Sequence, residues 1–192
     1  MVHIVLASQS PRRQQLLPQI GITDFTVLVP DVDESYDPAQ PPREIVSSIS
    51  RRKALAARDM LNDPDALVIA ADTMVFQGQR RLGKPRDEAD AFAMLSALSD
   101  ADHLVCTGVT LCRRERLLTC CEDTTVHFRP LTDEEIRSYI RSGEPMDKAG
   151  AYGAQGKAAL FVSHIHGDYF NVMGLPLYRL GQMLQDFGVS LF

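Results

Sequence analysis

Acidic residues follow two of the predicted strands, at positions where a hydrolytic enzyme could carry its carboxylates. Asp72 follows the apolar run 66–71, and the acidic run 31–34 follows a strand-like segment at 25–30. Open α/β sheets bind ligands at the carboxyl ends of strands, so Asp72 is predicted to act there as a general base or a metal ligand. Two such strand ends lying side by side could hold one Mg²⁺ through oxygen ligands. The alternatives are an Asp that caps the next turn and a solvated acidic loop.

Cations and backbone amides are expected to converge near the start of the chain. The segment 7–13 reads Ala-Ser-Gln-Ser-Pro-Arg-Arg and leads from a strand into a helix that begins with Ser10 and Pro11. Free N–H groups and the guanidinium groups of Arg12 and Arg13 are suited to phosphate oxygens. Two arginines in a first turn oppose the helix dipole, so an anion is expected between them. An ordinary capped helix with exposed arginines is the alternative.

Three lysines extend this set of cations. Lys53 falls within the apolar stripe of a helix predicted over 43–61, where its ammonium must either meet an anion or reach outward to water. Lys84 lies between Gly83 and Pro85, and Lys148 follows Asp147 and precedes Ala149 and Gly150, so both lysines are expected in rigid loops. With the two arginines, they predict one cleft for a polyphosphate, its metal and a carboxylate base.

A glycine-rich segment at 150–156 could approach a flat ligand. Glycine recurs there at every third residue, and Gln155 offers one acceptor and two donors. A tight turn is the alternative. His164 and His166 would share a face of a strand, but a zinc site needs a third ligand, so the sequence does not favour one.

The composition excludes several classes of protein. The chain has 192 residues, 45% of them hydrophobic and 23% charged, which indicates one compact globular domain. A net charge of −5 and the lack of Trp argue against a nucleic-acid-binding surface. No apolar run approaches the roughly 20 residues of a membrane span, and the first residues do not resemble a secretory signal, so a cytoplasmic protein is expected. The four cysteines form no Cys-x-x-Cys and are expected to be reduced.

Short strand-like runs alternate with helical runs, which predicts an α/β fold. Strands are expected over 2–7, 25–30, 66–71, 104–111, 117–128 and 160–165, and helices over 11–20, 43–61, 87–98, 132–143 and 175–187. A hairpin-like return is expected from Val75 to 83–85, and Thr132 with Glu135 forms a capping box. Early parallel crossovers and later hairpins make the predicted sheet mixed.

A series of short motifs resembles the Maf nucleotide pyrophosphatases, which are also known as septum-formation-inhibitor-like proteins. The matching segments are 6–13, 33–34, 52–54, 71–73, 83–85, 107–109, 143–156 and 171–176, and they occur in order over nearly the whole chain. The resemblance implies an α/β fold of the inosine-triphosphate-pyrophosphatase type, in which an elongated mixed sheet is flanked by helices and two lobes surround a cleft. It also implies that residues 1–192 form a single catalytic domain and that the chain is a homodimer.

The resemblance implies an activity as well: hydrolysis of a nucleoside triphosphate to the monophosphate and diphosphate. The form Gly-Ala-Tyr-Gly-x-Gln-Gly is similar to the branch that acts on dTTP and UTP. By this resemblance Asp72 accepts a proton, and Arg12, Thr73 and Gln155 set substrate choice. Gln155 could also match cytosine by turning its amide over, so CTP and modified pyrimidine nucleotides stay open.

The resulting hypothesis assigns one metal ion and a set of phosphate ligands. Glu34 and the triphosphate would hold Mg²⁺ or Mn²⁺ while Asp72 activates water. The side chains expected to bind the substrate's phosphates are Ser8, Arg12, Arg13, Lys53 and Lys84. Such an enzyme could keep modified nucleotides out of nucleic acid and influence cell division. A 7-methyl-GTP pyrophosphatase and a non-catalytic nucleotide-binding regulator of septum formation are the alternatives.

Overall fold

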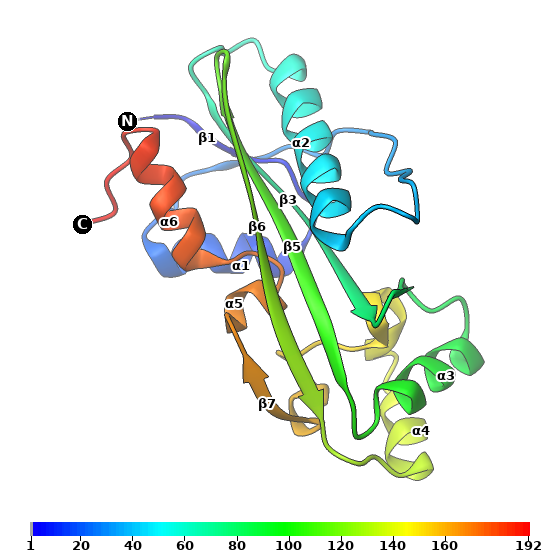
Figure 1. Ribbon diagram of the computed structural model, residues 1–192. Helices are drawn as coiled ribbons and strands as arrows, with labels where there is room; N and C mark the ends of the chain where they lie inside the picture. Colours follow the sequence, from blue (N-terminus) through cyan, green and yellow to red (C-terminus); the bar gives the residue numbers. More distant parts are fainter. Residues whose placement is uncertain (1) are drawn as a thin grey trace. The chain divides into compact units, whose positions relative to one another are not determined.

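The computed structural model describes residues 2–192, whose strands form one mixed sheet (Figure 1). Its seven strands run in the order β2-β1-β3-β5-β6-β7, and β4 pairs with β3. The strands are β1 (Ile4–Leu6), β2 (Thr26–Val27), β3 (Leu67–Gln77), β4 (Arg80–Leu82), β5 (Asp102–Arg113), β6 (Arg116–Phe128) and β7 (Val162–His166). β1 is parallel to β2 and β3, whereas β4 is antiparallel to β3 and β7 to β6. The predicted α/β fold with a mixed sheet is confirmed.

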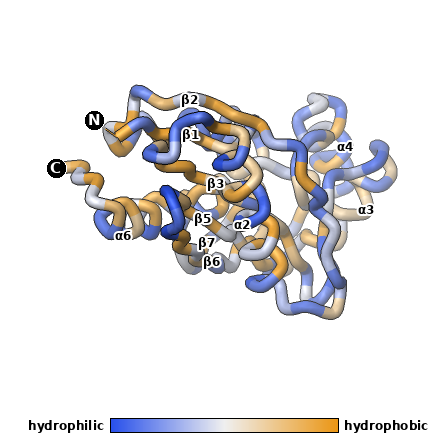
Figure 2. The backbone as a smooth tube through the Cα atoms, turned by 90° about the horizontal axis from the view of Figure 1, so that it is seen from above, coloured by the Kyte–Doolittle hydropathy of each residue, from blue (hydrophilic) through white to orange (hydrophobic). Residues whose placement is uncertain are grey.

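Helices connect and flank these strands. They are α1 (Pro11–Leu16), α2 (Pro42–Met60), α3 (Glu88–Leu98), α4 (Asp133–Arg141), α5 (Tyr169–Val172) and α6 (Leu177–Asp186), with 3-10 helices η1 (Leu17–Ile20), η2 (Glu144–Asp147), η3 (Ala149–Ala151) and η4 (Lys157–Leu160). The capping box at Thr132 and Glu135 is present, and Asp87 caps α3 by accepting a hydrogen bond from the amide of Asp90. Figure 2 shows α6 with hydrophobic and hydrophilic residues on different sides, as expected for a helix that packs on a sheet.

The chain divides into two compact units. The first comprises the described residues up to Asp72 together with Thr107–Glu122 and Gly174–Phe192, and the second comprises Thr73–Cys106 and Asp123–Met173. Part of the first unit's core forms where Ala54 and Ala57 of α2 pack with Val5, Val68 and other small residues of β1 and β3.

Small residues allow α2 to lie close to β5. A Cβ added to Gly108 of β5 would overlap with the backbone of Val46, so only glycine fits at this position. One turn further along α2, the buried hydroxyl of Ser50 lies 3.0 Å from that of Thr110. These contacts fix the helix that carries Lys53.

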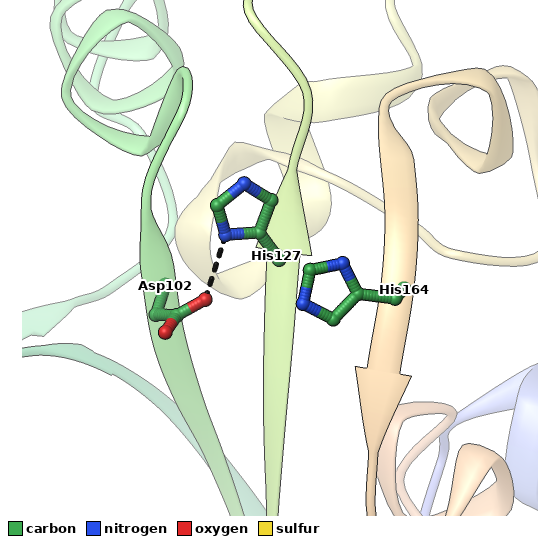
Figure 3. A group of neighbouring side chains, drawn as sticks. All are labelled: Asp102, His127 and His164. Carbon is green, nitrogen blue, oxygen red and sulfur yellow. Dashed lines mark hydrogen bonds and ion pairs between the residues drawn. The ribbon is translucent and has the colours of Figure 1, made fainter.

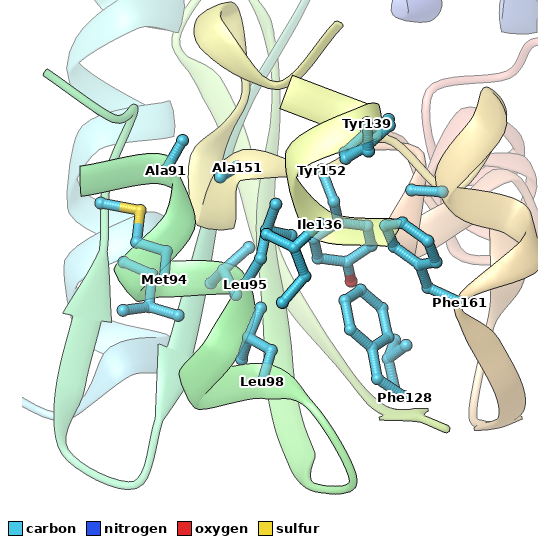
Figure 4. Close-up of a cluster of buried hydrophobic side chains, with 14 of the residues drawn as sticks. Ala91, Met94, Leu95, Leu98, Phe128, Ile136, Tyr139, Ala151, Tyr152 and Phe161 are labelled. Carbon is cyan, nitrogen blue, oxygen red and sulfur yellow. The ribbon is translucent and has the colours of Figure 1, made fainter. Parts of the chain in front are cut away.

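An aromatic cluster forms the core of the second unit (Figure 4). Phe128 contacts the rings of His103, Tyr152 and Phe161 edge-on, with centroids 4.8 to 5.9 Å apart, and Tyr139 of α4 contacts Phe161 in the same way. Edge-to-face contacts of this kind are the favoured arrangement of aromatic pairs. The cluster supports the segment that contains Gln155.

Several predicted elements have different ends in the structure. The strand predicted over 66–71 does not end at Asp72, because buried residues resume at Met74 and β3 continues to Gln77. β2 has only two residues, both exposed, because this edge strand buries little. β7 starts two residues later than predicted, because residues 157–160 form η4. Met60, predicted to lie on the buried stripe of α2, is 55% exposed.

No helix within residues 2–192 is long and apolar enough to span a membrane. All four cysteines are free, as predicted, and Cys106 and Cys112 are buried.

Candidate active site

Lys53 joins two carboxylates from separate parts of the first unit. Its Nζ lies 2.8 Å from Asp72 Oδ1 on β3 and 2.8 Å from Glu34 Oε1 in the loop before α2. The side chains of Lys53 and Asp72 are only 15% and 10% exposed, whereas that of Glu34 is 54% exposed. The ammonium predicted on the apolar stripe therefore meets anions, which offsets the cost of burying its charge.

One oxygen of Asp72 has no partner among the described residues. Oδ2 is buried and accepts no hydrogen bond from any of them, while Oδ1 accepts from Lys53. Buried carboxylate oxygens are almost always hydrogen-bonded, so an unpaired one indicates a position for a ligand, a water molecule or a metal ion. Because Asp72 and Glu34 offer oxygen atoms only, they suit a hard divalent cation such as Mg²⁺ or Mn²⁺.

Asp72 does not stand at a strand end, but it does lie where β3 changes its partner. Parallel pairing with β1 reaches Ile69, and antiparallel pairing with β4 begins at Val75. Asp72 therefore lies beyond the carboxyl end of β1. The predicted location at the carboxyl edge of parallel strands applies to β1 rather than to the strand that carries Asp72.

Hydrogen bonds within the loop and from Arg52 of α2 fix the rest of the acidic segment around Glu34. Asp33 accepts hydrogen bonds from the backbone and the hydroxyl of Ser35, at 2.8 and 2.6 Å. Arg52 of α2 donates to the backbone oxygens of Asp33 and Ser35. These bonds place Glu34, and not Asp33, beside Lys53.

Arg13 is fixed beneath the loop that follows β1. Its Nε donates to the backbone oxygen of Gly174 at 2.8 Å, and its NH1 donates to Ser8 Oγ at 3.1 Å. Ser8 Oγ also accepts from the amide of Ser10, at 3.2 Å. Ser10 and Pro11 occupy the predicted N-cap and N1 positions of α1, although the Ser10 side chain forms no capping bond.

The two arginines and Asp72 influence one another electrostatically. Burial lowers the pKa of Arg13, the charge of Arg12 lowers it further, and the charges of Asp72 and Glu34 oppose both effects. Arginine remains protonated in proteins, so these interactions leave a fixed positive charge near the carboxylates. Ser8, Arg12, Arg13, Glu34, Lys53 and Asp72 all belong to the first unit.

Thr73, Lys84 and Gln155 belong to the second unit. Thr73 is half-buried on β3, next to Asp72 in the chain, whereas Lys84 and Gln155 are exposed in loops. Their roles in substrate binding stay predictions.

Glu144 holds the glycine-rich segment and was missed from sequence. Its Oε1 accepts a hydrogen bond from Tyr139 OH at 3.0 Å, and its Oε2 accepts one from the amide of Lys157 at 3.2 Å. The Tyr139 hydroxyl in turn accepts from the amide of Gly153, at 3.3 Å. A Cβ at Gly156 would overlap with the Glu144 carboxyl group, so this glycine serves the protein's own packing. Glu144 and Tyr139 thus fix both sides of Gln155.

His103 supports the same segment from the core. Its Nε2 lies 2.7 Å from Tyr152 OH, and the residue is 2% exposed. Burial lowers the pKa of His103 to about 4, so the imidazole is neutral at pH 7. Burial also raises the pKa of the Tyr152 phenol, which stays protonated. Tyr152 therefore anchors the segment in the core.

Lys148, predicted as a further cation for a ligand, is bound within its own loop. Its Nζ donates to the backbone oxygen of Glu144 at 2.7 Å and to Asp147 Oδ1 at 2.6 Å. The structure thus gives this lysine a structural role.

Comparison with known proteins agrees with this description. A family model described as Maf-like protein matches residues 3–187. A dTTP/UTP pyrophosphatase from Symbiobacterium thermophilum is 50% identical over 192 residues, which cover 100% of this chain and 97% of that protein. A dTTP/UTP pyrophosphatase from Bacillus cereus is 45% identical over 190 residues, 99% of this chain and 98% of that protein.

A solved structure shows that the fold is shared more widely. A HAM1 protein from Coxiella burnetii matches with a TM-score of 0.50 and 17% sequence identity, covering 97% of this chain and 100% of that one. At this identity the match concerns the fold alone. The family match over nearly the whole sequence, together with relatives at 45–50% identity, shows that the chain belongs to the family of Maf-like proteins.

Proposed function

We propose that this protein hydrolyses nucleoside triphosphates, above all dTTP and UTP, to the nucleoside monophosphate and diphosphate. The full-length similarity to proteins named dTTP/UTP pyrophosphatase supports the substrate class. One structural observation carries the proposal: Asp72 is nearly buried, is oriented by Lys53 through one oxygen, and receives no hydrogen bond from residues 2–192 at its other oxygen.

Asp72 acts as the general base in this proposal. Lys53 fixes its Oδ1, which leaves Oδ2 to accept a proton from the water that attacks the α-phosphorus. A positioned base of this kind contributes about 10²- to 10⁴-fold to the rate. Glu34, with its exposed carboxylate beside the same ammonium, is the proposed ligand of Mg²⁺ or Mn²⁺. When bound, such an ion would neutralise charge on the phosphates.

The cationic side chains are proposed to bind the triphosphate in two ways, by direct contact with its phosphates and by a fixed positive charge nearby. Arg13 is fixed by Gly174 and Ser8 and supplies charge from a constant position. Arg12 and Lys84 are proposed to contact phosphate oxygens directly, together with Lys53 and Ser8. Positioning and charge stabilisation of this kind account for most of the catalysis in phosphoryl transfer.

Gln155 is the proposed reader of the base, with Thr73 and Arg12 as further selective contacts. Uracil and thymine present a carbonyl acceptor beside an N–H donor, which the two amide atoms of Gln155 match. The amide's position depends on the hydrogen bonds that fix Gly153 and Lys157 on either side. CTP and modified pyrimidine nucleotides are included among the candidate substrates.

Diphosphate release from a panel of nucleoside triphosphates tests the proposal. In the presence of Mg²⁺ or Mn²⁺, dTTP and UTP should be hydrolysed faster than GTP, and Gln155→Ala should reduce this preference. Lys157→Ala is the matched control, because its exposed side chain lies two residues further along, at the start of η4. An unchanged dTTP to GTP ratio in Gln155→Ala would remove this residue from base recognition. Preference for 7-methyl-GTP would overturn the substrate class, and no release from any nucleotide would favour a non-catalytic regulator.

The proposal includes an assembly and a location. We infer that residues 1–192 act as one catalytic domain, that two copies form a homodimer, and that the enzyme works on the nucleotide pools of the cytoplasm. Light scattering should give twice the chain mass of 21.3 kDa. A mass of one chain at enzyme concentrations used in assays would contradict the dimer.

A further inference from the structure

Two histidines and an aspartate, side chains of the kinds that can ligate metals, lie together on the second unit, on the face of the sheet opposite its aromatic core. Along β6, Val126 and Phe128 are buried whereas His127 between them points to the other face. The pairing of β6 with β7 sets His127 opposite His164, in regular register with the two pairs before it. Asp102, at the start of β5, reaches the same place, so three neighbouring strands contribute one side chain each (Figure 3).

The ligand atoms of these residues lie close together. One atom from each of Asp102, His127 and His164 can be chosen so that all three lie within 4.8 Å of one another. His127 Nδ1 is 2.7 Å from Asp102 Oδ1, and the two imidazole rings are stacked with centroids 4.7 Å apart. Asp100 adds a second carboxylate, 3.9 Å from His127 Nε2. The site therefore combines two imidazoles with negative charge.

We propose that Asp102, His127 and His164 bind a divalent transition-metal ion of the zinc class. Two imidazole nitrogens and a carboxylate oxygen form a ligand set that Zn²⁺ accepts readily, with a fourth position left to water. Mg²⁺ prefers oxygen ligands throughout, so this set discriminates against the ion proposed beside Asp72. The sequence suggested His166 as the partner of His164, whereas the strand pairing brings His127 and Asp102 to His164 and leaves His166 outside the group.

Small side-chain movements suffice to complete the geometry. Ligand atoms around a tetrahedral Zn²⁺ lie about 3.4 Å apart, so no separation has to shrink by more than about 1.4 Å. His164 is exposed and is held by its stacking on His127 and by Ser163 Oγ, 3.1 Å from its Nδ1. Rotation of this ring can therefore bring its nitrogen to the ion, while the shorter contact between Asp102 and His127 opens to admit it.

Binding of Zn²⁺ to the purified full-length chain tests the proposal by calorimetry. His127→Ala and His164→Ala should each lose one equivalent of Zn²⁺ or bind it at least 10-fold more weakly, since even loss of an outer-shell partner costs about 10- to 100-fold in metal affinity. His166→Ala is the matched control, because His166 lies on the same strand two residues away and outside the group. Equal stoichiometry and affinity in all four proteins would overturn the proposal.

Two further measurements locate the ion and guard against misfolding. Asp72→Asn should keep the Zn²⁺ equivalent, and its loss in that variant alone would show that the ion binds at the carboxylates of the first unit instead. In the wild type, imidazole NMR signals of His127 and His164 should shift with Zn²⁺ while that of His166 does not; the reverse pattern contradicts the assignment. None of these tests uses a nucleotide, so their outcome is independent of the proposed hydrolysis.

Discussion

Removal of the Glu144 carboxylate should loosen the segment that carries Gln155. In Glu144→Ala the Tyr139 hydroxyl loses its acceptor, and so does the amide of Lys157. The hydrogen bond from the Gly153 amide to Tyr139 OH would weaken in turn, because the hydroxyl is no longer held in place. The substitution thus releases the backbone on both sides of Gln155 and leaves Gln155 itself unchanged.

The expected size of the effect follows from these two bonds. A hydrogen bond to a charged group contributes about 1.5–3 kcal/mol, and water can replace part of this at the half-buried Glu144. We therefore expect the free energy of local opening to fall by about 2–4 kcal/mol. Since about 1.4 kcal/mol corresponds to a factor of ten, the open state becomes roughly 30- to 1,000-fold more populated.

Hydrogen exchange at two amides measures this opening directly. Exchange at Gly153 and Lys157 should accelerate by at least about 30-fold in Glu144→Ala, while amides in α3 keep their rates. The dTTP to GTP rate ratio should fall as well if Gln155 reads the base. Glu134→Ala is the matched control, since Glu134 is 76% exposed and pairs with Arg141 across the surface of α4. Unchanged exchange at Gly153 and Lys157 would refute the reasoning.

Two further predictions concern stability. His103 is neutral in the folded protein, where its pKa is about 4, whereas the unfolded chain takes up a proton at this residue below about pH 6.5. The free energy of unfolding should therefore decrease by up to about 3 kcal/mol as the pH is lowered from 6.5 to 4. Urea unfolding of His103→Gln should lack this part of the pH dependence, and equal slopes would contradict a neutral buried imidazole. Gly108→Ala should lower stability by about 1–3 kcal/mol or more, because the new Cβ would lie 2.8 Å from the backbone nitrogen of Ser47 and closer still to Val46. Gly83→Ala, where the Cβ meets nothing within 4 Å, should cost much less, and equal thermal shifts would argue against this packing.

The sequence predicted the chemistry of the first unit better than its geometry. An ammonium on an apolar helix stripe needs an anion nearby, and Lys53 indeed meets Asp72 and Glu34. The end of β3 was predicted wrongly because a single Asp-Thr pair interrupts an otherwise apolar run. Periodicity could not show that the strand continues with new partners on the far side of Asp72.

The residues missed from sequence depend on contacts between distant segments. Glu144 reaches Tyr139 through a turn after α4, and nothing in its local spacing distinguishes it from a solvated acid. His164 lies opposite His127 because of the register between β6 and β7, which the local residue pattern does not reveal. Residue types therefore predicted which chemistry is available, whereas pairing and register decide which side chains meet.

The most direct test of the central claim is diphosphate release from dTTP and UTP by Asp72→Asn. The substitution keeps the side chain's size but removes its negative charge, and with it the capacity to accept a proton; Glu34 remains as the carboxylate partner of Lys53. We predict a loss of about 10²- to 10⁴-fold in turnover with a folded protein, while Asp59→Asn, which alters an exposed acid at the end of α2, stays near the wild-type rate. Turnover close to wild type in Asp72→Asn would contradict the assignment of Asp72 as the general base.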